Sequence, residues 1–134
     1  MTDLQLMQLA VEAREMAYAP YSGFRVGAAL LGKSGKVYKG CNVENAAYTP
    51  TNCAERTALF KAVSEGEKEF TAIAIVGGMY ESIADFCAPC GVCRQVLAEF
   101  CDKDFRLILG NPDNIKTFTF EEILPFAFGK GDLE

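Results

Sequence analysis

The sequence predicts a three-layer α/β/α fold around a mixed sheet of roughly five strands. Its predicted elements run helix, hairpin, helix, strand, helix, strand and a C-terminal piece. Parallel strands need helical crossovers, so this order places helices on both faces of one sheet. The apolar run 72–76 suits a central strand that is covered on both sides. With no linker or repeat in 134 residues, we expect one domain, residues 1–134.

The first half of the chain is predicted to form a helix, a hairpin and a second helix. The first helix should run from about Thr2 to Ala19, with Thr2 or Asp3 as its cap and Pro20 beyond its end. Its apolar stripe contains Leu4, Met7, Val11 and Tyr18, widened by Leu6, Ala10, Ala13 and Ala17. Extended runs at 24–31 and 37–43 flank a glycine-bearing turn and indicate a β-hairpin. The second helix should start near Cys53 and bury Ala58, Leu59, Ala62 and Val63.

The second half alternates strands and helices. Residues 71–77 and 105–109 are predicted strands, and Pro89 favours the start of a helix between them. That helix should bury Val92, Val96, Leu97 and Phe100. Residues 111–114 form a turn, after which Thr119 and Glu122 fit a capping box for a short helix ending near Pro125.

The charge balance restricts the class of partner. The net charge is -5, and no run of Lys or Arg provides the basic footprint that nucleic acid strands or anionic membranes require. A small, nearly neutral ligand fits better. No apolar segment is long enough to span a bilayer and the N-terminus has no leader pattern, so we expect a cytoplasmic protein. In that compartment the six cysteines are expected to be metal ligands or buried thiols, not disulfides.

Three cysteines and one glutamate form the most informative pattern. Cys53, Cys90 and Cys93 can bind one zinc ion and leave its fourth position open, which is the arrangement of a catalytic zinc site. The chain contains no histidine, so a carboxylate such as Glu55 is the candidate proton shuttle. Cys53 and Glu55 can face the same site only if Cys53 occupies the non-helical cap position of its helix.

Neighbouring arginines offer charge compensation. Zinc with three thiolates carries a net charge of -1 (+2 − 3), which weakens it as a Lewis acid unless a cation or hydrogen-bond donors offset the charge. Arg56 and Arg94 directly follow Glu55 and Cys93, and both could donate to ligand sulfurs. We expect Arg56 to be the main compensating cation.

The residues alone leave other functions of the cysteines open. The Cys90–Cys93 spacing by itself favours structural zinc or a redox pair at a helix N-terminus. A structural-zinc interaction domain could use Cys87 as the fourth ligand, whereas a thiol–disulfide oxidoreductase leaves Cys53 and Glu55 unexplained. An iron–sulfur run would need a Cys-Pro that is absent after Cys93. Cys41 and Cys101 are expected to be buried free thiols.

Several motifs in order resemble one known family. Three ligands with a non-ligand glutamate are the signature of zinc deaminases. The chain is similar to the small homotetrameric cytidine deaminases, with a three-cysteine zinc site, over nearly its whole length. The motifs that carry this resemblance are residues 17–22, 24–30, 40–48, 53–58, 89–95 and 124–128.

The resemblance implies an activity and a set of roles. It implies zinc-dependent hydrolysis of free cytidine and 2′-deoxycytidine to uridine and 2′-deoxyuridine plus ammonia, in pyrimidine salvage. It also implies a homotetramer with shared sites and one Zn²⁺ per subunit. The implied substrate-binding residues are Phe24, Asn42, Glu44 and Ala54 of one subunit, with Ala46, Tyr48 and Phe128 from neighbouring subunits. A deaminase for another aminonucleoside is the alternative within the family. Residues 49–52 vary from the usual lead-in, and the segment 79–86 before Cys87 is longer than is usual.

Overall fold

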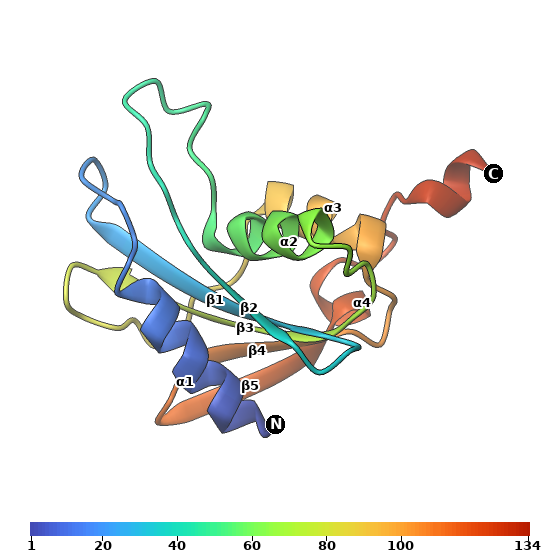
Figure 1. The fold of residues 1–134 in the computed structure, drawn as a ribbon, viewed down its shortest axis with the longest axis horizontal. Helices are drawn as coiled ribbons and strands as arrows, with labels where there is room; N and C mark the ends of the chain where they lie inside the picture. The colour runs from blue at the N-terminus through green and yellow to red at the C-terminus, as the bar shows by residue number, and fades with distance from the viewer.

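A computed structural model describes all residues, 1–134, and contains one five-stranded sheet with the strand order β2-β1-β3-β4-β5 (Figure 1). The strands are β1 (Phe24–Gly32), β2 (Val37–Cys41), β3 (Phe70–Met79), β4 (Arg106–Asn111) and β5 (Asn114–Thr119). The helices are α1 (Asp3–Arg14), α2 (Ala54–Ser64), α3 (Gly91–Phe100), α4 (Phe120–Ile123) and the 3₁₀ turn η1 (Lys130–Leu133).

The loops that build the site lie at one end of the strands, where β1 begins and β2 and β3 end. The β1–β2, β1–β3 and β4–β5 pairs are antiparallel, whereas β3 and β4 are parallel. Phe24 at the start of β1 therefore pairs with Met79 at the end of β3. The loops that lead into α2 and α3 leave the sheet at this same end, because β2 and β3 both end there. The two connections, β2–α2–β3 and β3–α3–β4, thus start at the same end of the sheet and bring the N-terminal ends of α2 and α3 together.

The sheet is covered on both faces, as predicted, and alternate residues of each central strand serve different layers. One face packs against α1 (Figure 1) through a cluster of Leu6, Met7, Ala10, Ala29, Ala72, Ala74, Val76 and Ile108. The other face packs against α2 and α3 through a cluster that includes Ala28, Leu30, Ala58, Leu59, Ile73, Ile75, Leu97 and Leu107. The prediction of a central strand at 72–76 is confirmed, since all five residues are fully buried.

The first helix is shorter than predicted. Thr2 caps α1 in a capping box with Gln5, but the helix ends at Arg14 instead of Ala19. The backbone of Tyr18 pairs with the chain beyond β2, because its N–H donates to Asn42 O (2.9 Å) and its O accepts from Glu44 N–H (2.8 Å). Tyr18 is consequently 54% exposed and does not continue the buried stripe.

Two further expectations need correction. Residues 114–119 form the edge strand β5, which the sequence did not reveal because this polar segment lacks an apolar run. Val92 is 57% exposed rather than buried, since it lies in the first turn of α3 and faces away from the sheet. The Thr119–Glu122 capping box is confirmed, at the start of α4.

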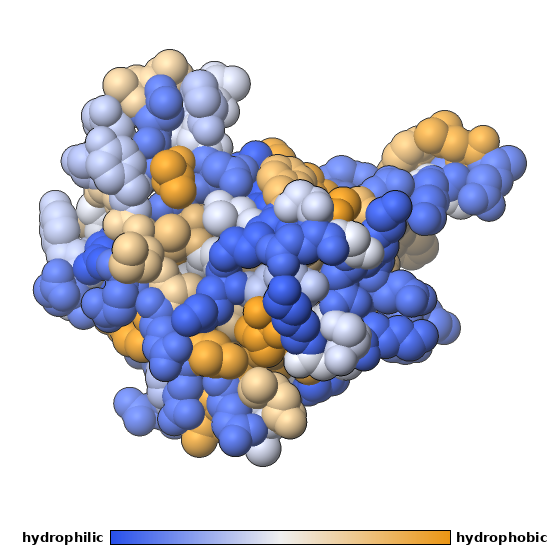
Figure 2. All heavy atoms as spheres, in the orientation of Figure 1, coloured by the Kyte–Doolittle hydropathy of each residue, from blue (hydrophilic) through white to orange (hydrophobic).

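Two segments extend from the body of the molecule (Figure 1): the loop between β2 and α2, and the C-terminal segment that ends in η1. The C-terminal segment carries an apolar patch at the upper right of Figure 2. Its exposed apolar residues are Phe126, Phe128 and Leu133. None of the helices is both long enough and apolar enough to cross a membrane.

Candidate metal centre and active site

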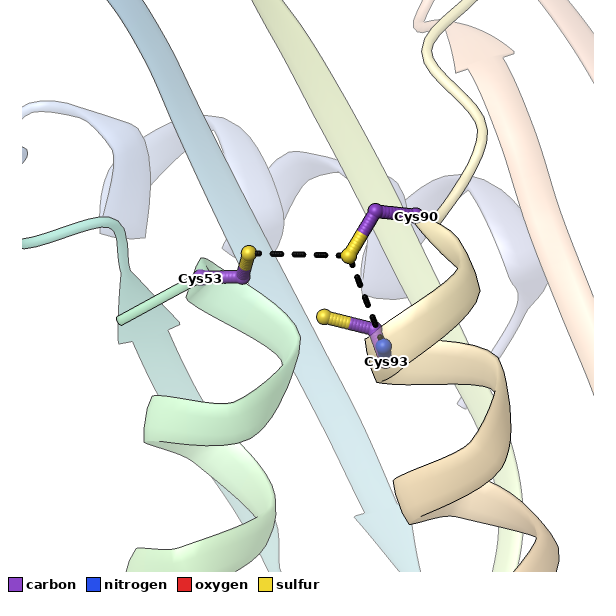
Figure 3. A group of neighbouring side chains, drawn as sticks. All are labelled: Cys53, Cys90 and Cys93. Carbon is purple, nitrogen blue, oxygen red and sulfur yellow. Dashed lines mark hydrogen bonds between the residues drawn. The ribbon is translucent and has the colours of Figure 1, made fainter. Parts of the chain in front are cut away.

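Three thiols meet between the N-terminal ends of α2 and α3 (Figure 3). Cys53 is the N-cap of α2 with extended backbone angles (φ −76°, ψ 157°), and Cys90 is the N-cap of α3 (φ −69°, ψ 168°). Cys93 lies one turn into α3 and is fully buried. The predicted non-helical cap position of Cys53 is confirmed, and it lets Cys53 share a site with Glu55.

The sulfur positions fit zinc. The three Sγ atoms lie within 4.8 Å of one another, and Cys53 Sγ is 3.8 Å from Cys90 Sγ. Tetrahedral zinc with bonds of about 2.3 Å to sulfur would space its ligands about 3.8 Å apart. Cys87 is not part of this group, so the closed four-sulfur site of a structural zinc is disfavoured. Cys41 and Cys101 are partly buried free thiols outside the group.

Hydrogen bonds make Cys53 the thiol that ionises most readily. Donation from Cys93 and from Arg56 lowers the pKa of Cys53 to about 5, although desolvation opposes the shift. The same hydrogen bond raises the pKa of Cys93, which retains the shared proton when no metal is bound. Arg56 Nη2 donates to Cys53 Sγ at 3.2 Å. Arg56 is therefore close enough to offset the negative charge of Cys53, which is the role that we expected for it from the sequence.

Arg94 does not donate to sulfur, which corrects the second part of that expectation. Its Nε donates to Pro89 O and its Nη1 to Ile123 O, both at 2.8 Å. A guanidinium is planar and rigid, so hydrogen bonds to two carbonyls fix its orientation. Arg94 therefore anchors the residue that precedes Cys90 and ties α3 to the end of α4.

Glu55 is a buried carboxyl beside the thiols. It is 5% exposed, and burial raises the pKa of its side chain to about 7, with a further contribution from the negative charge of Cys53. A group whose pKa lies near neutrality can both accept and return a proton at that pH. Glu55 thus has the protonation behaviour of an acid–base catalyst.

A cavity of about 290 Å³ opens onto this centre. The lining residues are Ser22, Phe24, Val26, Asn42, Glu44, Thr51, Asn52, Cys53, Ala54, Glu55, Cys87, Ala88 and Cys90. A larger cavity of about 380 Å³ lies at the opposite end of the sheet, near Phe70 and Phe105, but it contains no thiol. The smaller cavity is the candidate site because it alone joins the metal-binding group to a buried titratable carboxyl.

Two polar side chains that line the cavity are held by hydrogen bonds to neighbouring residues. Asn42 donates from Nδ2 to Phe24 O (2.8 Å) and accepts at Oδ1 from Val26 N–H (2.9 Å). Glu44 accepts from the backbone N–H groups of Tyr21 and Ser22 and from the Ser22 hydroxyl. Although desolvation opposes the shift, these hydrogen bonds lower the pKa of Glu44, which favours a carboxylate that can accept from a ligand hydroxyl.

The structure separates the predicted site residues into two groups. Phe24, Asn42, Glu44 and Ala54 line the cavity together with Cys53, Cys90 and Glu55, whereas Cys93 is fully buried and does not line it. Ala46, Tyr48 and Phe128 do not line the cavity of their own chain and are exposed. Tyr48 is 73% exposed and Phe128 is 59% exposed. Gln95 Nε2 of α3 donates to Phe128 O at 2.9 Å.

Sequence reasoning missed several lining residues. Ser22 lies in the motif 17–22, but nothing in the pattern predicted that its hydroxyl donates to Glu44 and accepts from Phe24 N–H. Asn52 precedes the first ligand, and its Nδ2 donates to Thr57 Oγ1, which in turn donates to Cys53 O. A polar residue directly before a helix cap is a signal that could have identified Asn52.

Three clustered thiols beside a buried glutamate match the signature of a zinc-dependent hydrolytic deaminase. Residues 1–109 match the family model described as "Cytidine and deoxycytidylate deaminase zinc-binding region". The chain is 52% identical to a cytidine deaminase of Halalkalibacterium halodurans, over 96% of this chain and 95% of that protein. It is 34% identical to a blasticidin-S deaminase of Bacillus cereus, over 94% of this chain and 91% of that protein.

The crystal structure of a cytidine deaminase from Burkholderia pseudomallei is similar in fold, with a TM-score of 0.88 and 47% identity over 96% of this chain and 100% of that one. The chain therefore belongs to the zinc-dependent cytidine deaminase family. Its cofactor is zinc, one ion per subunit, for which Cys53, Cys90 and Cys93 form the cluster.

Proposed function

We propose that the chain, as a single domain of residues 1–134, hydrolyses free cytidine and 2′-deoxycytidine to uridine and 2′-deoxyuridine with release of ammonia. The observation that carries this proposal is the convergence of three thiols beside the buried Glu55 carboxyl, at a cavity of about 290 Å³ that Cys53, Cys90 and Glu55 line. Membership of the cytidine deaminase family supports the same reaction.

In the proposed mechanism, Cys53, Cys90 and Cys93 would hold a zinc ion, which would act as a Lewis acid and make water a nucleophile near neutral pH. Glu55 removes a proton from the attacking water and delivers it to ring N3, which makes C4 of the base electrophilic. Backbone groups near Ala88 and Cys90 hold the tetrahedral intermediate. A second proton transferred through Glu55 allows ammonia to leave. Burial supports this double role, because it brings the pKa of Glu55 to about 7.

The remaining lining residues orient the nucleoside. The Ala54 N–H at the start of α2 is proposed to donate to the base carbonyl, and Phe24 to lie against the base. Asn42 and Glu44 are proposed to hold the ribose 3′-hydroxyl. Asn42 Oδ1 and the Glu44 carboxylate are fixed by hydrogen bonds from backbone N–H groups, so little orientational freedom is lost when they bind a sugar.

The charge of the cavity favours a nucleoside over a nucleotide. Its lining residues include Glu44 and Glu55 and no Lys or Arg. A 5′-phosphate would add like charge without a cation to pair with it, which costs several kcal/mol in complexes. We therefore expect deoxycytidylate to react at least about a hundredfold less efficiently than 2′-deoxycytidine.

The test is release of ammonia from four substrates: cytidine, 2′-deoxycytidine, deoxycytidylate and blasticidin S. We expect rapid release from the two nucleosides, loss of activity after treatment with a zinc chelator, and recovery when Zn²⁺ is restored. Blasticidin S is included because of the Bacillus cereus relative. A preference for blasticidin S would show that blasticidin S, and not cytidine, is the substrate. No ammonia release from any of the four compounds would overturn a deaminase function.

A homotetramer with shared sites is proposed as the working assembly, in the cytoplasm and in pyrimidine salvage. Ala46, Tyr48 and Phe128 extend from the body of the chain, and two of them expose large aromatic surfaces. Exposed apolar patches of this kind indicate interaction sites. On this proposal Ala46 and Tyr48 complete the cavity of one neighbour and Phe128 that of another.

Subunit complementation tests the shared sites. Phe128→Ala and Glu55→Gln should each be weakly active, but a mixed oligomer contains some sites with an intact Glu55 and an intact Phe128 from different chains. We expect mixing and reassembly to raise activity well above the sum of the two variants, with a mass of four 14.6 kDa chains by light scattering. Activity that stays at the sum would contradict sharing through Phe128.

A further inference from the structure

The side chain of Arg14 is buried on the α1 side of the site and has no acidic partner. It is 4% exposed at the C-terminal end of α1, and none of the ion pairs in the structure includes it. Burial and the nearby charge of Arg25 lower the pKa of its guanidinium. A buried cation needs hydrogen-bond acceptors, and here they are all backbone carbonyls.

The carbonyls bound by Arg14 belong to two separate segments. Its Nε donates to Arg25 O at 2.9 Å, on β1. Its Nη2 donates to Gly78 O (3.0 Å) at the end of β3 and to Tyr80 O and Ser82 O (2.6 Å each) in the loop that follows. This loop belongs to the segment before Cys87 that is longer than is usual in the family that the chain resembles.

The loop that Arg14 binds is connected to two walls of the cavity. On the β1 side, Tyr80 N–H donates to Gly23 O at 2.7 Å, between the lining residues Ser22 and Phe24. On the other side, Ala84 N–H returns to Gly77 O at 2.8 Å. Gly77 lies directly against the lining residue Cys87, since a Cβ at this glycine would be 2.8 Å from Cys87 Sγ.

We propose that Arg14 is a positioning residue that holds the two walls of the nucleoside cavity, 22–24 and 87–88, at their correct separation. Arg14 is not part of the thiol group and does not line the cavity. It acts through the folded loop 78–84, in which Gly78 is required because a Cβ there would lie 2.1 Å from Ser82 O. The metal end has an independent anchor, since Arg94 Nε holds Pro89 O directly before Cys90. Loss of Arg14 should therefore widen the cavity without releasing zinc.

The substrate part of this inference rests on the proposed function. Arg14→Met keeps the length of the side chain and removes its donors. We expect KM for cytidine and the Kd of the product uridine to rise about tenfold, with kcat within about threefold of wild type and zinc still at one per chain. Arg14→Lys, which offers a single donor group in place of a planar fork, should give intermediate values.

Arg106→Met is the matched control. Arg106 also secures α1, through a 2.7 Å ion pair with Asp3 at its other end, and lies away from the cavity. The Arg106→Met variant should have a lower Tm, with KM for cytidine and the uridine Kd unchanged. A second readout is the rate at which a thiol reagent modifies Cys87, relative to Cys101, measured by peptide mass spectrometry. This rate should rise in Arg14→Met but not in Arg106→Met.

Arg14→Met with a lower Tm but with KM, uridine Kd and Cys87 labelling all within about twofold of Arg106→Met would overturn the proposal. The labelling readout does not depend on the reaction. If wild-type protein failed to deaminate cytidine, faster labelling of Cys87 in Arg14→Met would still support the two-wall role, and the proposed function alone would be lost.

Discussion

Glu55→Gln is expected to lower kcat for cytidine by about 10²–10⁴-fold while the protein keeps its fold and its zinc. The amide cannot take a proton from water or return one to N3. It can, however, occupy the same place, because the folded chain already favours the neutral form of a carboxyl that is 5% exposed and whose pKa is raised to about 7. Removing the charge should therefore cost little stability. Uridine formation and zinc content must be measured on the same sample.

Glu67→Gln provides the control for this experiment. Glu67 is also partly buried and accepts from Ser34 and from the Tyr38 hydroxyl, but it does not line the cavity. Its replacement should leave kcat unchanged. Glu55→Gln that retained zinc and produced uridine at near the wild-type rate would remove Glu55 from the proton-transfer role.

The parts of the site that the sequence could predict are those fixed by local backbone rules. The sulfur of each cysteine points in a direction that is fixed by its position at the start of a helix. The structure confirms that the three sulfurs converge. The buried central strand followed in the same way from an apolar run that needs cover on both faces. In each case neighbouring residues in the chain contain the information.

The parts that could not be predicted depend on contacts between distant segments. Arg94 was a reasonable donor to sulfur by position, but Ile123 O, twenty-nine residues away, determines its direction. Arg14 falls within the predicted first helix, but three of its four carbonyl partners lie sixty-four to sixty-eight residues further along the chain. The early end of α1 has the same origin, since Tyr18 pairs with Asn42 and Glu44 across the sheet edge. Long, flexible side chains and unpaired backbone groups take their partners from the tertiary fold.

Arg56→Met is expected to weaken zinc binding by about 10- to 100-fold and to lower kcat, because residues that support metal ligands typically have effects of this size. Arg56 Nη2 lies 3.2 Å from Cys53 Sγ, and its hydrogen bond helps to keep that sulfur ionised. Without the cation, three thiolates would leave a net charge of -1 on the bound zinc and make it a weaker Lewis acid. Arg56 Nε is buried without a partner in the chain, so the guanidinium is held in place chiefly by its contact with sulfur.

Two further variants separate charge from geometry. Arg56→Lys keeps the positive charge. If charge compensation explains the effect, this variant should retain most of the zinc affinity. If the planar donor explains it, Arg56→Lys should lose as much zinc affinity as Arg56→Met. Lys61→Met removes a cation from the same helix whose ammonium bonds only to Lys39 O, and should change neither quantity. Competition with a chromogenic chelator gives the affinity. An unchanged zinc affinity and kcat in Arg56→Met would show that the helix N-termini alone stabilise the three thiolates, since each presents unpaired N–H groups and the positive end of a dipole to the sulfurs.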